Sequence, residues 1–309
     1  IGEGEGRYKG EVMNMEDILK TEGLEPVRIH LREGLALING TSFMTGAGLI
    51  NIIYAKRLLK WELLASMMIN ELVASFDDHF SEGLNNTKRH QGQKEIASMM
   101  RECLSSSKMI RRRDDHFYNG KHQKDLVFDE KLQEYYSIRC LPQILGPVLE
   151  TINNAESVLT DELNSVNDNP VIDHQEGNVY HGGNFHGEYV AAEMDKLKAS
   201  VTKLSMLAER QLNYLLNNKI NMLLPPFVNL GKLGINFGMQ GAQFTATSTV
   251  AENQSLSFPM HVHSIPNNND NQDIVSMGGN AALMCSKVID NTFEVLAIHL
   301  LTIIQAVDY

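Results

Sequence analysis

The sequence predicts a mainly α-helical protein, and long stretches of helical periodicity are the main reason. Between Glu188 and Asn221 no glycine or proline interrupts the chain, and apolar residues recur at spacings of three and four. This spacing places the apolar side chains on one face of a helix. At 1.5 Å per residue the helix would be about 50 Å long. A helix of that length belongs to a bundle larger than one small domain.

Four further segments are predicted as helices. The segment that follows Pro142 has apolar residues at helical spacing as far as Leu163, and we expect it to end at Asn169-Pro170, because proline disfavours helix in the residue before it. The other three run from Thr45 to Phe76, Phe237 to Leu256 and Asp273 to Val307. The last is apolar on nearly every side, which indicates burial in a core or an oligomer.

Strands are expected only as short pieces. Val171–Asp173 and Asn178–Tyr180 are suited to pair as a hairpin across the turn between them. The chain has no repeat of about 20 to 50 residues and no low-complexity linker, so we predict one helical domain over residues 1–309. The chain begins at Ile1 rather than Met and stops directly after an apolar stretch. We therefore expect it to be the middle of a longer protein, truncated at both ends.

Composition narrows the possible partners and compartments. The net charge of -11 argues against a nucleic-acid partner, since it leaves no basic groove for a polyanion. The three cysteines are far apart and odd in number, which fits a reducing compartment, and we expect the cytoplasm. No run of about 18 consecutive apolar residues and no apolar leader occurs, so no membrane partner is expected.

The most informative stretch is Gln133–Cys140, which places a phenol, a hydroxyl and a guanidinium within one and a half helical turns. Arg139 can donate two parallel hydrogen bonds to a carboxylate, and Tyr136 would share its face if the stretch is helical. Three other stretches are equally rich in polar groups: Asn39–Thr41, His181–His186 and Asn267–Asp273. Together they predict a small polar substrate that carries a carboxylate.

Six motifs occur in the order found in aromatic amino acid ammonia-lyases, and the chain resembles that family from end to end. The motifs are Asn39-Gly40-Thr41, Tyr136-Ser137-Ile138-Arg139-Cys140, Asn167-Asp168-Asn169-Pro170, Gly182-Gly183-Asn184-Phe185-His186, Leu224-Pro225-Pro226-Phe227 and Asn271-Gln272-Asp273. The resemblance is strongest to bacterial tyrosine ammonia-lyases. It implies a long central helical bundle of the fumarase/aspartase-like and ammonia-lyase type.

The resemblance also implies a reaction. Members of this family remove ammonia from an α-amino acid and leave a trans-α,β-unsaturated acid. Their electrophile is a 4-methylidene-imidazol-5-one (MIO) ring, formed from their own Ala-Ser-Gly, and no such tripeptide occurs here. The resemblance places that tripeptide, and a lid tyrosine that acts as a base, before Ile1. We therefore expect a parent protein that is a carbon-nitrogen lyase without a metal, and an isolated fragment that is inactive.

Three residues take central roles by resemblance. Arg139 would bind the substrate carboxylate with both arms of its guanidinium, which lysine could not do. Tyr136 would lie near the substrate amine and the electrophile, where it would assist proton transfer. Asn39 would lie beside the MIO ring and the substrate carboxylate, and it would donate a hydrogen bond from its side-chain amide. The alternatives are a structural ion pair for Arg139, a core position for Tyr136 and a simple turn at Asn39-Gly40.

Five further side chains and two glycines complete the substrate site that the resemblance implies. Gln133 and Gln272 would form an amide shell around the electrophile and the amine, although glutamines are more often solvated. Phe185 would pack edge-on to the electrophile or the substrate ring, with core packing as its alternative. Gly182 and Gly183 would permit close approach of the backbone. Met239 and Asn268 stand where plant phenylalanine lyases have a lysine and a glutamate. At these two positions the sequence therefore resembles the bacterial tyrosine ammonia-lyases.

The substrate is predicted from Gln272. Histidine ammonia-lyases carry a glutamate at this place, so the neutral amide favours phenylalanine or tyrosine. We predict L-tyrosine, converted to p-coumarate and ammonia. Three alternatives stay open: a histidine ammonia-lyase that forms urocanate, an MIO-dependent 2,3-aminomutase, and a noncatalytic helical scaffold.

The family assembles as a homotetramer in which three subunits build each active site, and the resemblance implies the same here. The apolar stripe from Val190 to Leu215 is a candidate for the shared core. His261-Val262-His263, with Asp270 and Asp273, is a weak metal candidate because a third fixed ligand is not evident. We therefore predict no metal.

Overall fold

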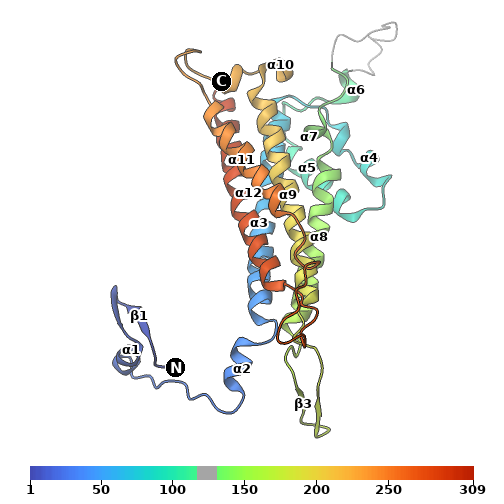
Figure 1. Ribbon diagram of the computed structural model, residues 1–309. Helices are drawn as coiled ribbons and strands as arrows, with labels where there is room; N and C mark the ends of the chain where they lie inside the picture. Colours follow the sequence, from blue (N-terminus) through green and yellow to red (C-terminus); the bar gives the residue numbers. More distant parts are fainter. Residues whose placement is uncertain (117–130) are drawn as a thin grey trace. The chain divides into compact units, whose positions relative to one another are not determined.

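The computed structural model describes residues 1–116 and 131–309 (Figure 1). These residues form two compact units, each described separately below. The first unit comprises residues 1–42 and 166–185, and the second comprises residues 43–165 and 186–309. The prediction of a mainly α-helical protein is confirmed.

Two small hairpins dominate the first unit. Strands β3 (Val171–Asp173) and β4 (Asn178–Tyr180) pair antiparallel with Val171 opposite Tyr180, as predicted. Strands β1 (Glu5–Tyr8) and β2 (Glu11–Asn14) form a second hairpin, which was not predicted. Helices α1 (Met15–Thr21) and α2 (Glu33–Ile38) follow it.

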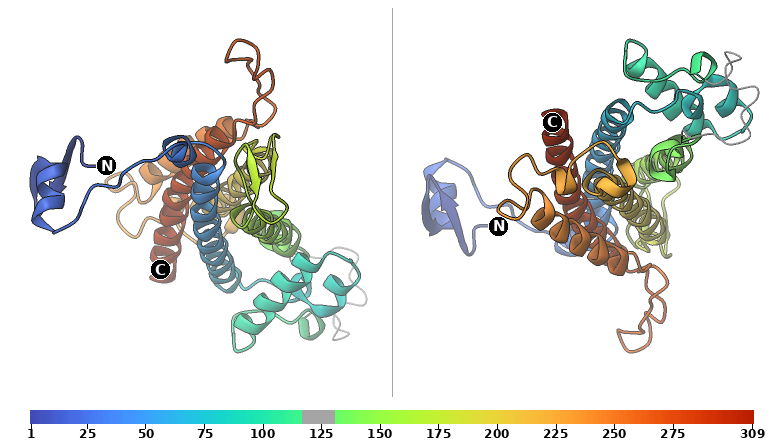
Figure 2. Two further views of the ribbon diagram at one scale, coloured as in Figure 1. Left: turned by 90° about the horizontal axis from the view of Figure 1, so that it is seen from below. Right: turned by 90° about the horizontal axis from the view of Figure 1, so that it is seen from above.

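Long helices build the second unit, and five of them lie side by side in a bundle (Figures 1 and 2). They are α3 (Ser42–Leu72), α8 (Leu141–Leu163), α9 (Glu188–Leu216), α11 (Gln240–Leu256) and α12 (Gly278–Val307). Helices α3, α9 and α12 run in one direction, and α8 and α11 run in the other. The shorter helices are η1 (Asp78–Phe80), α4 (Glu82–Asn86), α5 (Gln91–Leu104), α6 (Arg113–His116), α7 (Tyr136–Arg139), α10 (Asn218–Asn221) and η2 (Pro226–Val228).

Helix α9 is central to the core of the second unit. Its predicted apolar stripe is fully buried, including Leu197 and Leu212. Polar side chains fix its neighbours within the core, since buried polar groups need hydrogen-bond partners. Asn51 of α3 donates to the carbonyl of Ala282 of α12 at 2.8 Å, and Gln211 of α9 donates to the hydroxyl of Ser66 of α3 at 2.9 Å.

The five predicted long helices are confirmed, with differences at their ends. Helix α8 ends at Leu163, before the predicted stop at Asn169-Pro170, and the Asn164 side chain bonds back to the carbonyl of Thr160 at 2.7 Å. Such local bonds from a side chain to the backbone compete with continued helix. Helix α9 ends at Leu216, because Asn217 adopts an extended conformation.

Helix α12 is the one helix in residues 1–116 and 131–309 that is long and apolar enough to cross a membrane. Half of its most apolar window is buried within the structure. Asn291 and His299, both buried, lie on this helix. Burial and internal polar residues are the features of a core helix, which agrees with the prediction made from its apolar circumference.

Glu62 is a buried carboxyl group in helix α3. Only 1% of the residue is exposed, and its Oε1 has no hydrogen-bond partner. Burial raises the pKa of Glu62 from 4.5 to about 8, and a hydrogen bond with Ser66 opposes this rise. The carboxyl group is therefore protonated in the folded protein at neutral pH, whereas it ionises near pH 4.5 after unfolding.

Glu62→Gln is expected to change how stability depends on pH. Between pH 4.5 and 8 the folded protein holds a proton on Glu62 that the unfolded chain has released, so the free energy of unfolding falls as pH rises. The slope from this group is about 1.4 kcal/mol per pH unit. Urea unfolding of the wild type and the variant at pH 5.5 and 7.5 should show the variant gaining stability, relative to the wild type, at the higher pH. Glu156→Gln, at a half-exposed position, is the control, and equal slopes for Glu62→Gln and wild type would contradict this prediction.

Candidate active site

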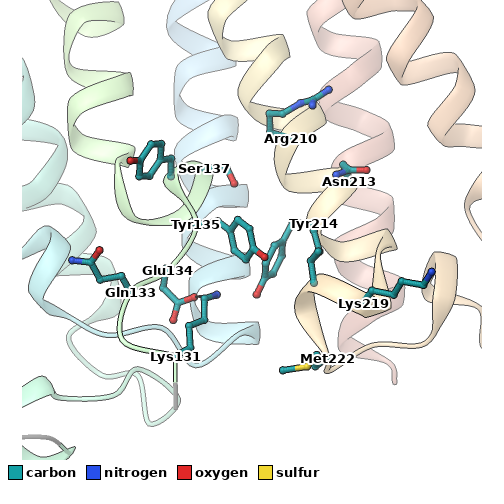
Figure 3. Close-up of a pocket in the computed structure, with 12 residues that line it drawn as sticks. Lys131, Gln133, Glu134, Tyr135, Ser137, Arg210, Asn213, Tyr214, Lys219 and Met222 are labelled. Carbon is teal, nitrogen blue, oxygen red and sulfur yellow. Dashed lines mark hydrogen bonds and ion pairs between the residues drawn. The ribbon is translucent and has the colours of Figure 1, made fainter. Parts of the chain in front are cut away.

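The segment of residues 131–140 forms one wall of a cavity of about 930 Å³ (Figure 3). The rings of Tyr135 and Tyr214 meet edge to face with their centres 5.3 Å apart. Lys131 places its ammonium group 4.6 Å from the Tyr135 ring. The remaining lining comes from Gln133, Glu134, Tyr136, Ser137, Arg210, Asn213, Lys219, Ile220 and Met222. The cavity is thus aromatic with cationic groups around it, which suits an aromatic anion.

Arg139 lies on the short helix α7 together with Tyr136. The guanidinium carbon is 4.8 Å from the centre of the Tyr136 ring, so the prediction that the two residues share a face is confirmed. The Nε atom of Arg139 is buried and has no hydrogen-bond partner. A buried donor without a partner is costly, so this nitrogen is available to an acceptor that enters the site.

A second cavity, of about 280 Å³, lies beside Arg139. Gln143, which also lines it, has a buried Oε1 without a hydrogen-bond partner. His79 contacts Asn70 through Nε2 at 3.0 Å, and burial lowers the pKa of His79 to about 4. His79 is therefore neutral at pH 7, and the arginines supply the positive charge at this cavity.

Tyr136 and Gln133 are exposed in this chain, and both line the larger cavity. Tyr136 is 70% exposed, so it does not occupy a core position. The backbone of the segment is held by the bundle, because Gln211 of α9 donates to the carbonyl of Ser137 at 2.8 Å.

Three other predicted residues lie elsewhere in the second unit. Asn268 and Gln272 are exposed in the loop that precedes α12, and the backbone of Gln272 pairs with Asn267 at 3.1 and 3.3 Å. Met239 is half-buried, directly before α11, and its N–H donates to the carbonyl of Phe227 at 3.0 Å.

One copy of the chain does not bring Arg139 and Gln272 together. The loop that carries Gln272 is fixed to α9 through His261, which contacts Asp195, whereas Ser137 is fixed through Gln211. About 24 Å of helix separates Asp195 from Gln211 at 1.5 Å per residue. Figure 1 shows the loop before α12 and helix α7 at opposite ends of the bundle.

The first unit contains the other two predicted residues. Asn39 follows α2, and its side-chain amide donates to the Asp168 carboxylate at 2.9 Å. The backbone of Asn169 and the amide of Asn39 together lower the pKa of Asp168. Gly40 has a φ of 77°, and a Cβ there would lie 2.4 Å from the carbonyl oxygen of Asn167. The Asn39-Gly40 and Asn167–Pro170 motifs therefore form one structure.

Phe185 is half-buried at the end of the first unit, consistent with neither full core packing nor full exposure. At Gly182 and Gly183 an added Cβ would meet no atom within 4 Å in residues 1–116 and 131–309. The close approach expected at these glycines is thus not made by the described residues, and it stays a prediction for a bound ligand.

The weak metal candidate has another explanation. The ring and the backbone N–H of His261 both contact the Asp195 carboxylate at 2.8 Å. His263 packs against the Phe258 ring, with ring centres 5.1 Å apart. The described part of the chain contains no group of three or more histidine, cysteine, aspartate or glutamate residues suited to hold a metal ion.

Comparison with known proteins gives the family. The sequence model of the family "Aromatic amino acid lyase" matches residues 1–309, the full length of the chain. The chain belongs to the aromatic amino acid lyase family. Its mainly helical fold agrees with solved structures of the family: phenylalanine aminomutase from Pantoea agglomerans superposes with a TM-score of 0.93 at 36% identity, covering 99% of this chain and 60% of that one.

Relatives in the family differ in activity. Tyrosine 2,3-aminomutase of Myxococcus sp. (strain Mx-B0) is 41% identical over 99% of this chain and 59% of its own length. Tyrosine ammonia-lyase of Cupriavidus metallidurans is 37% identical over 100% of this chain and 59% of its own length. Histidine ammonia-lyases also match. The chain thus spans about three fifths of the curated relatives that it matches, and they leave the substrate open.

Sequence reasoning did not predict several residues of the site. Lys131, Glu134 and Tyr214 line the larger cavity, and Arg111 contacts Glu134. Tyr214 is a buried residue of α9 that does not belong to the predicted apolar stripe, so the helical spacing gave no sign that it lines a cavity. The sequence did contain one signal: Glu134 lies between Gln133 and Tyr135 in the polar segment, which could have indicated that it belongs to the site.

Proposed function

We propose that the parent protein is an ammonia-lyase that converts L-tyrosine to p-coumarate and ammonia. The observation that carries this proposal is Arg139, whose buried Nε has no partner. Arg139 lines the smaller cavity and lies beside Tyr136, which lines the larger one. Arginine with a free donor suits a carboxylate, and the aromatic wall formed by Tyr135 and Tyr214 suits a ring. The family assignment supports the same reaction class.

Residues of this chain would hold and orient the substrate. Arg139 would bind the carboxylate with two parallel hydrogen bonds, which fixes the position of the β-carbon. The Tyr136 hydroxyl would then lie near the amine, where it assists proton transfer. Gln133 would donate from its amide at the same cavity. The role of Asn39 as an amide donor stays a prediction.

The proposed cofactor is MIO, and the free donors and amides of this chain fit a substrate held beside it. The ring would supply an electrophile for the substrate amine, while Arg139, Tyr136 and Gln133 of this chain would hold and orient the substrate. The ring forms from Ala-Ser-Gly, which is not among these 309 residues. One relative, from Streptomyces globisporus, is named an MIO-dependent tyrosine 2,3-aminomutase. We propose the same cofactor for the parent protein, with no metal.

A tyrosine 2,3-aminomutase is the second candidate. The relative that is 41% identical to this chain has that name, and the two reactions share the substrate. The neutral Gln272 supports an aromatic substrate over histidine in both cases. Tests of the parent protein must therefore detect a β-amino acid as well as the unsaturated acid.

We also propose that the parent assembles as a homotetramer in the cytoplasm. Arg139 and Gln272 lie toward opposite ends of the bundle, so a site that uses both needs more than one copy of the chain. Helix α3 supports this, because it exposes large apolar side chains at helical spacing. They are Phe43, Ile50, Tyr54, Trp61 and Leu64. An exposed apolar stripe of this size is typical of an oligomer interface.

The test is incubation of the full-length parent with tyrosine, phenylalanine and histidine in separate reactions. Ultraviolet absorbance follows each unsaturated acid, and chromatography detects any β-amino acid. We expect p-coumarate from tyrosine, and loss of product in Arg139→Ala. Formation of β-tyrosine as the main product would favour the aminomutase, urocanate alone would overturn the argument from Gln272, and no product from any substrate would favour a noncatalytic scaffold.

A further inference from the structure

We propose that Glu134 is a positioning residue of this site. Its buried carboxylate would fix the segment that carries Gln133, Tyr136 and Arg139, and so set where these side chains meet the substrate. The effect of Glu134 on catalysis rests on the proposed function. The positioning itself is visible in the contacts of the segment.

Glu134 is buried and contacts two cations. The side chain is 4% exposed, although the residues on both sides of it are exposed. Its Oε2 lies 2.6 Å from the Lys131 ammonium, and its Oε1 lies 3.8 Å from the Arg111 guanidinium. A buried carboxylate requires such partners, so the segment cannot shift without separating these charges.

Arg111 is itself fixed to the second unit. Its backbone N–H donates to Ser75 at 2.9 Å, its Nε donates to the carbonyl of Ala74 at 2.6 Å, and its guanidinium lies 4.1 Å from the centre of the Phe76 ring. Arg113 adds a second connection, because it donates to the carbonyl of Leu132 at 2.7 Å. Two arginines that follow α5 in sequence thus hold the segment before α7.

Glu134 also lies between the two cavities. Together with Gln133 it lines both the cavity of about 930 Å³ and the cavity of about 280 Å³. Tyr136 faces the first and Arg139 the second. Figure 3 shows Glu134 next to Lys131, beside the Tyr135 ring. A change in the position of Glu134 would therefore move the walls of both cavities, and with them the two groups proposed to act on one substrate.

The test compares Glu134→Gln and Glu134→Asp in the full-length parent. Glutamine keeps the shape but loses the charge, while aspartate keeps the charge on a shorter side chain. A misplacement of about 1 Å costs up to about 10²-fold in rate. We expect Glu134→Gln to lower kcat about 10²-fold with a smaller change in KM, and Glu134→Asp to recover part of the loss. A role in stability alone would lower Tm and leave kcat of the folded enzyme unchanged, which would overturn the proposal.

A second readout does not depend on activity. Hydrogen exchange of the amides in residues 131–140 should be faster in Glu134→Gln than in the wild type, with no change in α9. The matched control is Glu156→Gln, because Glu156 also contacts a lysine, Lys56, at 2.6 Å but is half-exposed. If the wild type forms no product, the proposed function fails, while faster exchange confined to 131–140 still supports positioning. Exchange equal to that of the wild type would overturn it.

Discussion

In the full-length parent, Arg139→Lys is expected to lower kcat/KM with tyrosine by about 10-fold to 150-fold, although the positive charge is kept. Lysine is a point charge and does not reproduce the planar pair of donors that a carboxylate accepts. Loss of a hydrogen bond to a charged group costs about 1.5 to 3 kcal/mol, which corresponds to this range in rate. Arg139→Ala should lower kcat/KM by about 10³-fold or more, because the carboxylate then loses its charged partner altogether.

Steady-state kinetics of the purified variants, with Tm measured for each, checks this expectation. Arg112→Lys is the control, since Arg112 is an exposed arginine. If Arg139 served as a structural ion pair, its variants would lose thermal stability and keep kcat/KM in the folded fraction. Wild-type kinetics for Arg139→Lys would contradict recognition by two parallel hydrogen bonds. A variant that loses activity without losing stability would support the carboxylate role.

Much of the fold is predictable from periodicity. The stripe of α9 could be found because helical spacing continues without glycine or proline, and its side chains are indeed buried. Helix ends are less predictable, because local side-chain bonds decide them. Asn164, for example, bonds back to Thr160 and α8 stops before the proline that was expected to end it.

The β1–β2 hairpin shows why short strands are missed. Strand β1 reads Glu-Gly-Arg-Tyr and β2 reads Glu-Val-Met-Asn, and none of their residues is buried, so no alternation of apolar and polar residues marks them. The turn at Lys9 and Gly10 is the only local signal in that hairpin, with φ of 48° and 95°. Positive φ at both central residues of a two-residue turn is typical of a hairpin. The Lys9-Gly10 pair could have indicated it.

The sequence motifs identified residues of the site, but not how those residues are arranged in space. Tyr136 and Arg139 are three residues apart, so helical spacing alone places them together. Gln272 is far along the chain, and nothing in the order of residues gives the direction of each helix in the bundle. Glu134 was missed for a related reason: its partner Arg111 comes from a different part of the chain, which only the fold brings close.

The second large effect is expected at a buried ion pair on α9. Lys198 is completely buried, and its ammonium donates to Asp195 at 2.7 Å and to the carbonyl of Phe258 at 2.8 Å. Burial alone would raise the pKa of Asp195, but hydrogen bonds from Lys198 and His261 outweigh it, and the pKa is lowered. A carboxyl group whose pKa is lower in the folded protein than in the unfolded chain stabilises the fold. Its contribution to the free energy of unfolding is fully present at neutral pH and is lost as pH falls through the pKa of the folded state.

Asp195→Leu or Lys198→Met is expected to cost about 3 to 5 kcal/mol in the free energy of unfolding at pH 7, because each leaves a buried charge without its partner. The double variant Asp195→Leu/Lys198→Met removes both charges, and it should recover much of the loss. Urea unfolding at pH 7 measures all three. Lys56→Met/Glu156→Leu, at a half-exposed pair, should stay within about 1 kcal/mol of the wild type.

The same ion pair connects stability to the site. Asp195 accepts two hydrogen bonds from His261, and the chain from His261 leads to Asn268 and Gln272. In the double variant the core regains its stability, but the loop loses its anchor on α9. We therefore expect near wild-type unfolding together with reduced kcat/KM in the full-length parent. A double variant that keeps full activity would show that Gln272 is placed without Asp195, and that the ion pair serves the bundle alone.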